Sequence, residues 1–334
     1  MGILNNKVSI SKIAEDLGVS VSTVSRALSG SGRISDATRQ RITEYLKDKK
    51  LVPNTRMKKY TDVTTNMVAV IFPDINHISV LPYFYHVFFS IYNYFSIRGY
   101  QVFPVMAGKE NMENVERLVE QHLVDGIVLT HGNTGKWIIE YLQKCGVPFV
   151  TLGSVNDPEI PQVETDDEGA SRDITNALIH RGLYRIAIIG GEKNSLLNRR
   201  RYKGILSAHV QNHMVIDEEY VFFHIESENS AEIAVDKILS GRQDCILCMD
   251  AHICLDVLKA LRKTKAEIPA DIKIASLYDS EFLDQWCPAV SCVHFDLDAL
   301  GREAAKLLYR NLTEYGAMTD AFLGYEIRMK ESTN

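Results

Sequence analysis

The spacing of apolar positions changes near residue 66, and the two patterns predict two kinds of structure. In the first fifty residues apolar side chains recur three and four positions apart, which is the spacing of one buried helix face. Gly18 suits the left-handed end of a helix, and Ser20 and Ser35 suit helix N-caps. This predicts a helix-turn-helix unit followed by a third helix. The expected inward positions are Ile10, Ile13, Ala14, Leu17, Val24, Ala27, Leu28, Ile42, Tyr45 and Leu46.

From Met67 onward, apolar runs of strand length alternate with segments of helix length. Alternating βα units predict parallel sheets with helices on both faces, and this many strands favours two doubly wound α/β lobes. The best place for a lobe boundary is residues 157–167, and residues 52–66, which lack a long periodicity, are expected to form a linker. The expected strands are 67–72, 100–105, 126–130, 147–152, 185–189, 220–224, 245–249 and 272–277.

Composition changes this picture mainly through the placement of charge. The 334-residue chain is 46% hydrophobic and 24% charged, as an ordinary globular protein is, and its formal net charge is −6. Residues 1–60 nevertheless hold twelve Lys and Arg against five Asp and Glu, so the remainder is strongly acidic. A basic segment of domain size on an acidic body favours nucleic acid as its partner.

Several other function classes lose support from the sequence. The opening residues turn polar after four positions, and the apolar run at 81–97 is short for a membrane span, so we expect neither a secretion leader nor a membrane anchor. The cysteines fit reduced thiols in a cytoplasm. Cys245 and Cys248 point to opposite faces of a strand, which predicts core thiols and no metal site. Neither HExxH nor GxSxG occurs, so no catalytic residue or cofactor is assigned.

The second expected helix has one outward face that is small, polar and basic. It is made of Val21, Ser22, Ser25 and Arg26. A recognition helix needs such a face, because its first turns must reach base edges and an Arg donates bidentately to guanine.

The same residues resemble a known family, the lactose and galactose repressor type of bacterial transcription regulators. The resemblance is carried by Ile13-Ala14, by GVSVSTVSRALSGSGRISDATRQRI at 18–42 and by Pro53-Asn54. It continues more loosely through VAVIFPDI at 68–75, VDGIVL at 124–129, GVPFV at 146–150, YRIAIIGG at 184–191, RYKG at 201–204 and MD at 249–250. It implies a dimeric DNA-binding repressor whose periplasmic-binding-protein-like body closes two lobes on a small molecule.

The resemblance also implies boundaries and contacts for each part. The DNA-binding head would span 1–51 and the linker 52–66, the N-terminal lobe 67–160 and about 294–322, and the C-terminal lobe 161–293 and about 323–330. Val21, Ser22 and Arg26 would read major-groove bases, with Arg33 near the same groove edge. The residues that position the DNA backbone would be Ser9, Ser20, Ser25 and Asn54.

The linker is expected to act only on DNA. Asn54 can cap a helix over residues 55–60, but this length is far below what an isolated helix needs, so DNA must order it. Arg56, Lys58 and Lys59 would then neutralise phosphates. By the resemblance, Tyr60 would take the position of the leucine that wedges into the minor groove.

A ligand cleft between the lobes is the second expected site. The family's cleft arginine matches Arg201 and its cleft aspartate matches Asp250, a pair that suits sugar hydroxyls. The positions that usually hold two further aspartates and an aromatic are here Tyr278, Gly153 and Ile225, which puts a standard hexose in doubt. Other candidate contacts are Asn76, His77, Ser79, Tyr83 and His131.

The expected function is therefore an effector-controlled operator-binding repressor of carbohydrate-utilisation genes. A sugar or sugar phosphate is the expected effector, but a nucleoside or purine ligand, a protein partner or an activating output would suit the same architecture. A sugar-transport protein would have no use for the basic head, and an enzyme would need a catalytic constellation. The resemblance implies a dimer, because tetrameric members of the family add a leucine-heptad helix at the C-terminus and here none follows the last strand. The aromatic helix at 83–97 is the candidate interface in the N-terminal lobe.

Overall fold

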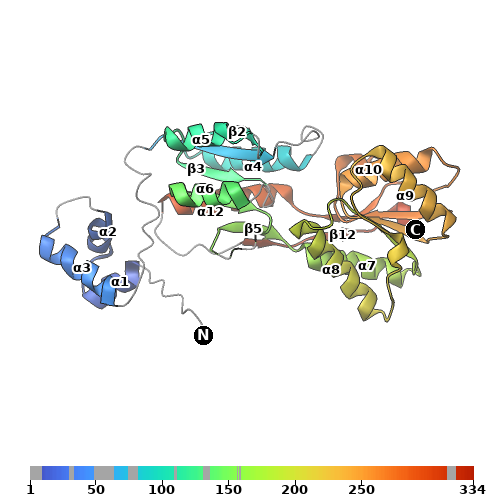
Figure 1. Cartoon of the computed structure of the whole chain (residues 1–334), viewed down its shortest axis with the longest axis horizontal. Coiled ribbons are helices and arrows are strands. Elements are labelled where there is room, and N and C mark those ends of the chain that lie inside the picture. Colours follow the sequence, from blue (N-terminus) through green and yellow to red (C-terminus); the bar gives the residue numbers. More distant parts are fainter. Residues whose placement is uncertain are drawn as a thin grey trace.

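The protein is described by a computed structural model that covers residues 10–29, 34–48, 64–73, 82–108, 111–130, 136–155, 157, 159–313 and 321–334. These residues form a small helical head and a body of two α/β lobes (Figure 1).

The head consists of three helices around its own apolar core. They are α1 (Ile10–Leu17), α2 (Val21–Ser29) and α3 (Asp36–Asp48). The core residues Ile13, Ala14, Val24 and Ile42 are buried, with Leu17, Val19, Ala27 and Tyr45 packed partly against them. The predicted helices are confirmed, and so are those inward positions whose side chains are described. Gly18 has a φ of +64°, and this left-handed residue ends α1 before the turn into α2.

The N-terminal lobe is built on a six-stranded parallel sheet of order β11-β5-β4-β3-β1-β2. One face packs on α4 and α12, and the other on α5 and α6. Successive residues of β1 alternate between the two cores, because neighbouring side chains of a strand point to opposite faces. The strands are β1 (Met67–Pro73), β2 (Gln101–Ala107), β3 (Gly126–Leu129), β4 (Phe149–Leu152), β5 (Gln162–Thr165) and β11 (Ala321–Leu323); the helices are α4 (Pro82–Ser96), α5 (Glu113–Glu120), α6 (Lys136–Cys145) and α12 (Leu297–Thr313).

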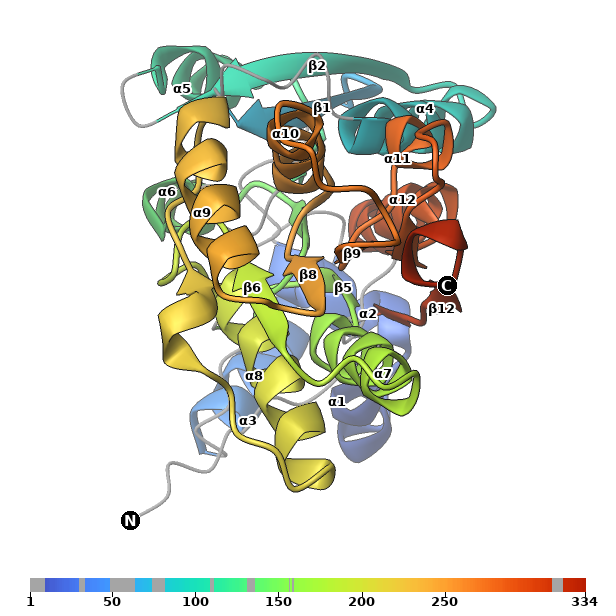
Figure 2. The same ribbon diagram turned by 90° about the vertical axis from the view of Figure 1, so that its right-hand side faces the viewer.

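The C-terminal lobe repeats this plan with the sheet order β12-β10-β9-β8-β6-β7. Only the pairing of β10 with β12 is antiparallel among the pairings of this sheet in the described part of the chain. Helices α7 and α8 cover one face, and α9 and α10 the other (Figure 2). Its elements are α7 (Asp167–His180), β6 (Ile186–Ile189), α8 (Leu196–Gln211), η3 (Glu218–Tyr220), β7 (Val221–Phe222), α9 (Glu228–Ser240), β8 (Cys245–Cys248), α10 (Ala251–Arg262), β9 (Lys273–Ser276), α11 (Glu281–Asp284), β10 (Ser291–His294), β12 (Glu326–Arg328) and η4 (Glu331–Thr333).

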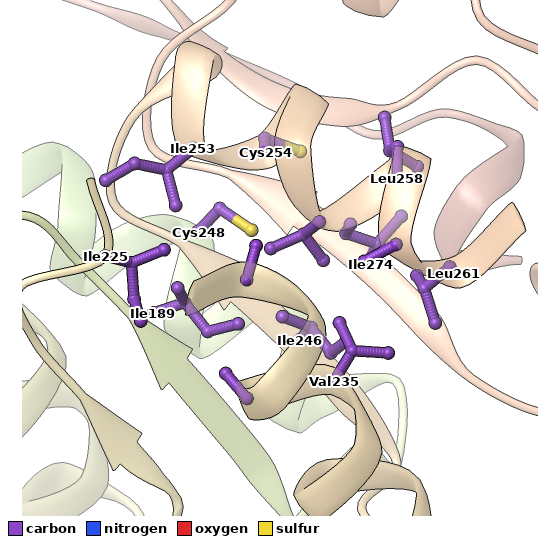
Figure 3. Packing of buried hydrophobic residues seen from close by; sticks show 14 of the residues in the cluster. Ile189, Ile225, Val235, Ile246, Cys248, Ile253, Cys254, Leu258, Leu261 and Ile274 are labelled. Atoms are coloured by element: carbon purple, nitrogen blue, oxygen red, sulfur yellow. The ribbon is translucent and has the colours of Figure 1, made fainter. Parts of the chain in front are cut away.

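The cysteines of β8 lie where the strand geometry predicts. Cys245 faces the core beneath α7 and α8, whereas Cys248 faces the core beneath α9 and α10, where it lies near Cys254 (Figure 3). All six cysteines of the chain are free thiols. Among the described residues, no group of three His, Cys, Asp or Glu side chains is arranged to hold a metal ion.

The two lobes share the chain through three crossings in its described part. The first follows β5 at Thr165, the second follows β10 at His294, and the third lies between β11 and β12. The first crossing falls inside 157–167 as expected, but the lobe boundary placed after residue 160 is too early. Residues 162–165 form β5, which pairs with β4 in the N-terminal sheet and not in the C-terminal one.

Helix α4 is the expected aromatic helix, and its outer face is apolar. Phe84, Val87, Ile91 and Phe95 point into the lobe and are buried. On the outer face, Tyr85 is 64% exposed, Phe89 43% and Tyr92 40%. No helix in the described ranges is both long and apolar enough to cross a membrane.

Candidate functional site

The outward face of α2 presents Val21 and Arg26. Val21 is 50% exposed and Arg26 is also exposed. Ser20 caps the helix, because its hydroxyl oxygen accepts the backbone N–H of Thr23 at 3.1 Å. Of Ser22 and Ser25 the structure describes the helical backbone, which places both on α2. The remaining head and linker predictions lie outside the described residues; these are Ser9, Arg33, Asn54, Arg56, Lys58, Lys59 and Tyr60.

Two hydrogen bonds fix α3 against α1 behind this face. The Arg41 guanidinium donates from Nη2 to the carbonyl oxygen of Leu17 at 3.0 Å, which satisfies the C-terminal end of α1. The Tyr45 hydroxyl donates to Asp16 at 2.5 Å. A rigid three-helix unit therefore presents the start of α2 outward, which is what insertion into a groove requires.

Arg201 is the centre of the second site. It lies on α8, where its side chain is only 4% exposed. Its Nε donates to Oδ1 of Asp167 at 2.9 Å, and its Nη1 donates to the carbonyl oxygen of Met249 at 2.5 Å. The other carboxylate oxygen of Asp167 accepts the Thr165 hydroxyl at 2.6 Å. Arg201 is thus fixed by partners from the first lobe crossing and from the end of β8.

Asp167 belongs to this cluster, although the sequence does not single it out. In the sequence it only ends the expected boundary stretch 157–167, whereas in the structure it stands in the first turn of α7 and its side chain is 7% exposed. A carboxylate buried this deeply must be paired, and Arg201 is its partner. The signal in the sequence was an acidic residue at a helix start, which has an ordinary explanation in the helix dipole.

Asp250 lies directly after β8, as expected, and caps α10. Its Oδ1 accepts the backbone N–H of His252 at 2.8 Å, while its Oδ2 lies 4.0 Å from Nη1 of Arg201. The side chain is 41% exposed. The carboxylate therefore serves the helix end and remains accessible to a ligand at the carboxyl edge of the sheet.

Beside Arg201 and Asp250, Tyr278 of the C-terminal lobe contacts Tyr83 of the N-terminal lobe. The Tyr278 ring stacks on Phe295 with centroids 5.5 Å apart, and the guanidinium carbon of Arg201 lies 5.6 Å from its centroid. Tyr83 comes from α4 of the other lobe, and its ring meets Tyr278 edge-on at 6.5 Å. Its hydroxyl donates to the carbonyl oxygen of Thr130 at 2.9 Å. Burial raises the pKa of both phenols, and Asp167 raises the pKa of Tyr83 further.

The structure thus gathers Arg201, Asp250, Tyr278 and Tyr83 from four different elements. Ile225 does not occupy a ligand-facing aromatic position, since it is buried in the core beneath α9 and α10. Gly153 follows β4 with a φ of +83°, a conformation that favours glycine over aspartate. The other predicted cleft residues lie outside the described residues; these are Asn76, His77, Ser79 and His131.

A hollow of about 730 Å³ lies beside this cluster, at the junction of α7, α8 and the N-terminal sheet. It contains as many basic as acidic side chains, so it has no excess charge. Arg200 spans the lobes there, donating to Glu164 of β5 at 2.7 Å and to Ser154. The lining residues are Glu164, Thr165, Asp166, Asp167, Glu168, Gly169, Arg172, Leu196, Arg199, Arg200, Lys203 and Phe322.

Comparison with known proteins matches both parts of this chain. Residues 9–54 match the family described as bacterial regulatory proteins, lacI family, and residues 175–333 match the periplasmic binding protein-like domain. Catabolite control protein A of Staphylococcus xylosus is 26% identical over 314 residues, which cover 92% of this chain and 93% of that protein. The HTH-type transcriptional regulator CelR of Thermobifida fusca is 28% identical over 311 residues, covering 90% of this chain and 91% of that protein.

Solved structures extend the likeness to the whole fold. A complex of the transcriptional regulator CelR with cellobiose has a TM-score of 0.73 and 26% identity, covering 97% of this chain and 99% of that one. The transcription regulator CcpA of Lactococcus lactis has a TM-score of 0.71 and 26% identity, covering 81% of this chain and all of that one, 100%. With its helix-turn-helix head and two-lobed body, the chain belongs to the lacI family of bacterial regulatory proteins and is a DNA-binding transcription regulator.

Proposed function

We propose that this regulator is a dimeric repressor whose affinity for a pseudo-palindromic operator is set by a small carbohydrate bound between its lobes. The observation that carries the ligand site is the immobile Arg201–Asp167 pair beside the accessible carboxylate of Asp250. Asp167 and Asp250 lie at helix starts of the C-terminal lobe, Arg201 lies in the second turn of α8, and Tyr83 faces this lobe from the other one, where it contacts Tyr278. A ligand between them would touch both lobes, so its binding energy can change their relative position. The solved complex of the similar regulator CelR with cellobiose supports a sugar.

The operator contacts that we propose start from α2. Val21, Ser22 and Arg26 read base edges, with Arg33 near the same groove edge. Ser9, Ser20, Ser25 and Asn54 position the phosphate backbone. In the linker, Arg56 and Lys58 neutralise phosphates and Tyr60 wedges into the minor groove at the operator centre. Lobe movement that separates the two linkers of a dimer would then release the DNA.

The outer face of α4 supports the proposed dimer. Three aromatic side chains, Tyr85, Phe89 and Tyr92, stand partly in solvent and contact one another in sequence along the helix. Aromatic residues are enriched at interfaces, and a two-fold pairing of this face would cover them. The two heads of such a dimer would reach half-sites about one helical turn apart.

Operator binding of single variants tests the DNA half of the proposal. After selection of bound sequences from a random DNA library, Arg26→Ala should weaken binding to the selected operator by roughly 1–3 kcal/mol and relax one base preference. Arg117→Ala removes the same charge from an exposed position of α5 and is the matched control. Equal loss on operator and random DNA would mean that Arg26 contacts phosphate.

The effector half is tested by titrating sugars, sugar phosphates and nucleosides against the operator complex. Asp250→Asn should abolish the response while operator affinity stays intact, because Asn also caps a helix. Arg201→Ala is the less clean variant, since it leaves Asp167 buried without its cation. A full response in the Asp250→Asn protein would remove the cleft from the proposal, and a response to a protein fraction alone would favour a protein effector.

A further inference from the structure

One carboxylate fixes the last residues of the linker to the N-terminal lobe. Asp125 stands between α5 and β3. Its Oδ1 accepts the backbone N–H and the hydroxyl of Thr65, both at 2.8 Å, and its Oδ2 accepts the backbone N–H of Asn66 at 2.9 Å. Hydrogen bonds to a charged acceptor are stronger than those between neutral groups. Both oxygens of Asp125 therefore hold the two residues that precede β1, and we call this arrangement the Asp125 clamp.

Backbone hydrogen bonds tie the same segment to both neighbours of β1. The carbonyl oxygen of Asn66 accepts the N–H of Gln101 at the start of β2 at 2.7 Å, and that of Met67 accepts the N–H of Asp125 at 2.8 Å. Strands β2 and β3 flank β1 in the sheet. Asn66 has a φ of +53°, a left-handed conformation that Asn adopts more readily than most residues. The direction in which the linker leaves the lobe is thereby fixed.

The Asp125 clamp lies at the amino edge of the N-terminal sheet, whereas the contact between the lobes lies at its carboxyl edge. The buried strand β3 joins the two edges. Asp125 directly precedes this strand, and Thr130 directly follows it. The carbonyl oxygen of Thr130 accepts the hydroxyl of Tyr83, whose ring contacts Tyr278 of the other lobe. The end of the linker therefore moves with the part of the lobe that meets its partner lobe.

The Asp125 clamp limits how far each linker can reach. An extended chain spans about 3.3–3.6 Å per residue, so release of Thr65 and Asn66 would lengthen the linker by about 7 Å. Base pairs follow one another at about 3.4 Å, so this added reach equals about two base-pair steps for each protomer. A dimer with clamped linkers should therefore discriminate between operators whose half-sites differ in spacing by this amount.

We propose that Asp125 is a positioning residue for operator recognition, which fixes the point where each linker leaves the N-terminal lobe and so sets the half-site spacing that the dimer accepts. Asp125 acts only through Thr65 and Asn66, without a contact to DNA or effector of its own. The inference rests on the proposed binding of a dimer to a pseudo-palindromic operator, and it adds a residue that determines which operators are accepted.

The test measures binding of the full-length protein to the selected operator and to versions with one or two base pairs inserted between the half-sites. Native protein should lose about ten-fold in affinity or more when two base pairs are inserted, because a clamped linker cannot span the longer site. Asp125→Ala should bind the selected operator more weakly, but the insertion should cost it less than about three-fold. A lobe that is merely destabilised would weaken binding to all three DNAs equally, so the ratio of affinities isolates the positioning role.

A conservative variant and a matched control complete the test. In Asp125→Asn the amide oxygen can still accept from Thr65, but the NH₂ group cannot accept from Asn66. Its spacing preference should lie between those of the native and Asp125→Ala proteins, and it decides the test if circular dichroism shows that Asp125→Ala does not fold. Asp157→Ala is the control, because Asp157 also accepts a backbone N–H, from Glu159 at 2.9 Å, in a loop of the same lobe outside the linker. It should keep the native ratios.

Three results would overturn the inference: a native protein that binds all three operators alike, native affinity ratios in the folded Asp125 variants, or loss of their binding to a single half-site, which the head contacts without the clamp. The proposed function has a separate readout. If the native protein binds a single half-site as tightly as the complete operator, the proposed dimeric operator binding fails, whatever the Asp125 variants do.

Discussion

Removing one member of the Arg201–Asp167 pair should destabilise the C-terminal lobe far more than removing both. In Asp167→Ala the guanidinium stays buried beside Tyr278, with the Met249 carbonyl as its hydrogen-bond acceptor and the partly exposed Asp250 carboxylate 4.0 Å away. Breaking a buried pair in this way costs about 3–5 kcal/mol, because the remaining charge is desolvated without compensation. A double variant, Asp167→Leu with Arg201→Met, removes both charges and restores apolar volume. It should lose only about 1–2 kcal/mol, mainly from the unpaired Met249 carbonyl and Thr165 hydroxyl.

Tryptophan fluorescence in urea measures this difference lobe by lobe. Trp286 packs against the core of the C-terminal lobe and Trp137 against that of the N-terminal lobe. In a Trp137→Phe background the signal therefore reports the C-terminal lobe alone. With a slope of about 3 kcal/mol per molar urea, Asp167→Ala should lower the midpoint by about 1–1.7 M, and the double variant by about 0.5 M. Asp167→Leu and Arg201→Met are also measured singly, and if their effects simply add in the double variant, the two side chains do not act as a buried ion pair.

Three further predictions address packing, acid stability and assembly. Gly204→Ala should lower the free energy of unfolding by about 1–3 kcal/mol although alanine favours helices more than glycine, because the new Cβ would lie 2.2 Å from the Glu168 carbonyl oxygen. The control Gly324→Ala, whose Cβ would have no atom within 4 Å, should be near neutral in the same urea titration. Burial opposes ionisation of Asp244, but hydrogen bonds from the Arg185 side chain and from two backbone N–H groups outweigh it and lower the pKa of Asp244 below its value in the unfolded chain. Ionised Asp244 therefore stabilises the fold above about pH 4, and this stability is lost as the pH falls through the pKa of the folded state. Asp244→Asn should therefore flatten the stability profile below pH 4 in acid titration, and an unchanged profile would assign the acid sensitivity elsewhere. Phe89→Glu should shift the protein from dimer to monomer in sedimentation velocity, while Glu113→Gln on exposed α5 should leave the distribution unchanged.

The sequence pattern predicted the strands that contain a continuous apolar run and missed four that do not. All eight expected strands are present, including the edge strands β2 and β7. The missed strands β5 (QVET) and β10 (SCVH) mix polar with apolar residues, although β10 is an interior strand and mostly buried, and β11 and β12 have three residues each. Strands this short owe their existence to their pairing partners, which periodicity within one segment does not contain.

The sequence predicts those residues of the site that directly follow a strand or lie in a recognisable motif. Asp250 could be placed because it comes directly after an obvious strand, and Arg201 through the RYKG motif. Asp167 could not be placed, because its role depends on the crossing of α7 over α8. That crossing requires Gly204 to meet the backbone of Glu168, a relation between residues far apart in the chain. The same holds for Tyr83 and Tyr278, which meet only once the two lobes are assembled.

The crossings between the lobes also determine when each lobe can complete its core during synthesis. Helix α12 closes the face of the N-terminal sheet that α4 shares, with Leu308 against Gly126, and β11 completes that sheet beside β5. Both come from residues after 296, so the first lobe to leave the ribosome is also unable to finish its core until residue 323 has been made. The C-terminal lobe likewise receives β12 only at the end of the chain. The N-terminal lobe therefore completes its core only late in synthesis, and until α12 is made the apolar face of β3 and β4 that this helix covers stays open, a kind of surface that exposes nascent chains to aggregation.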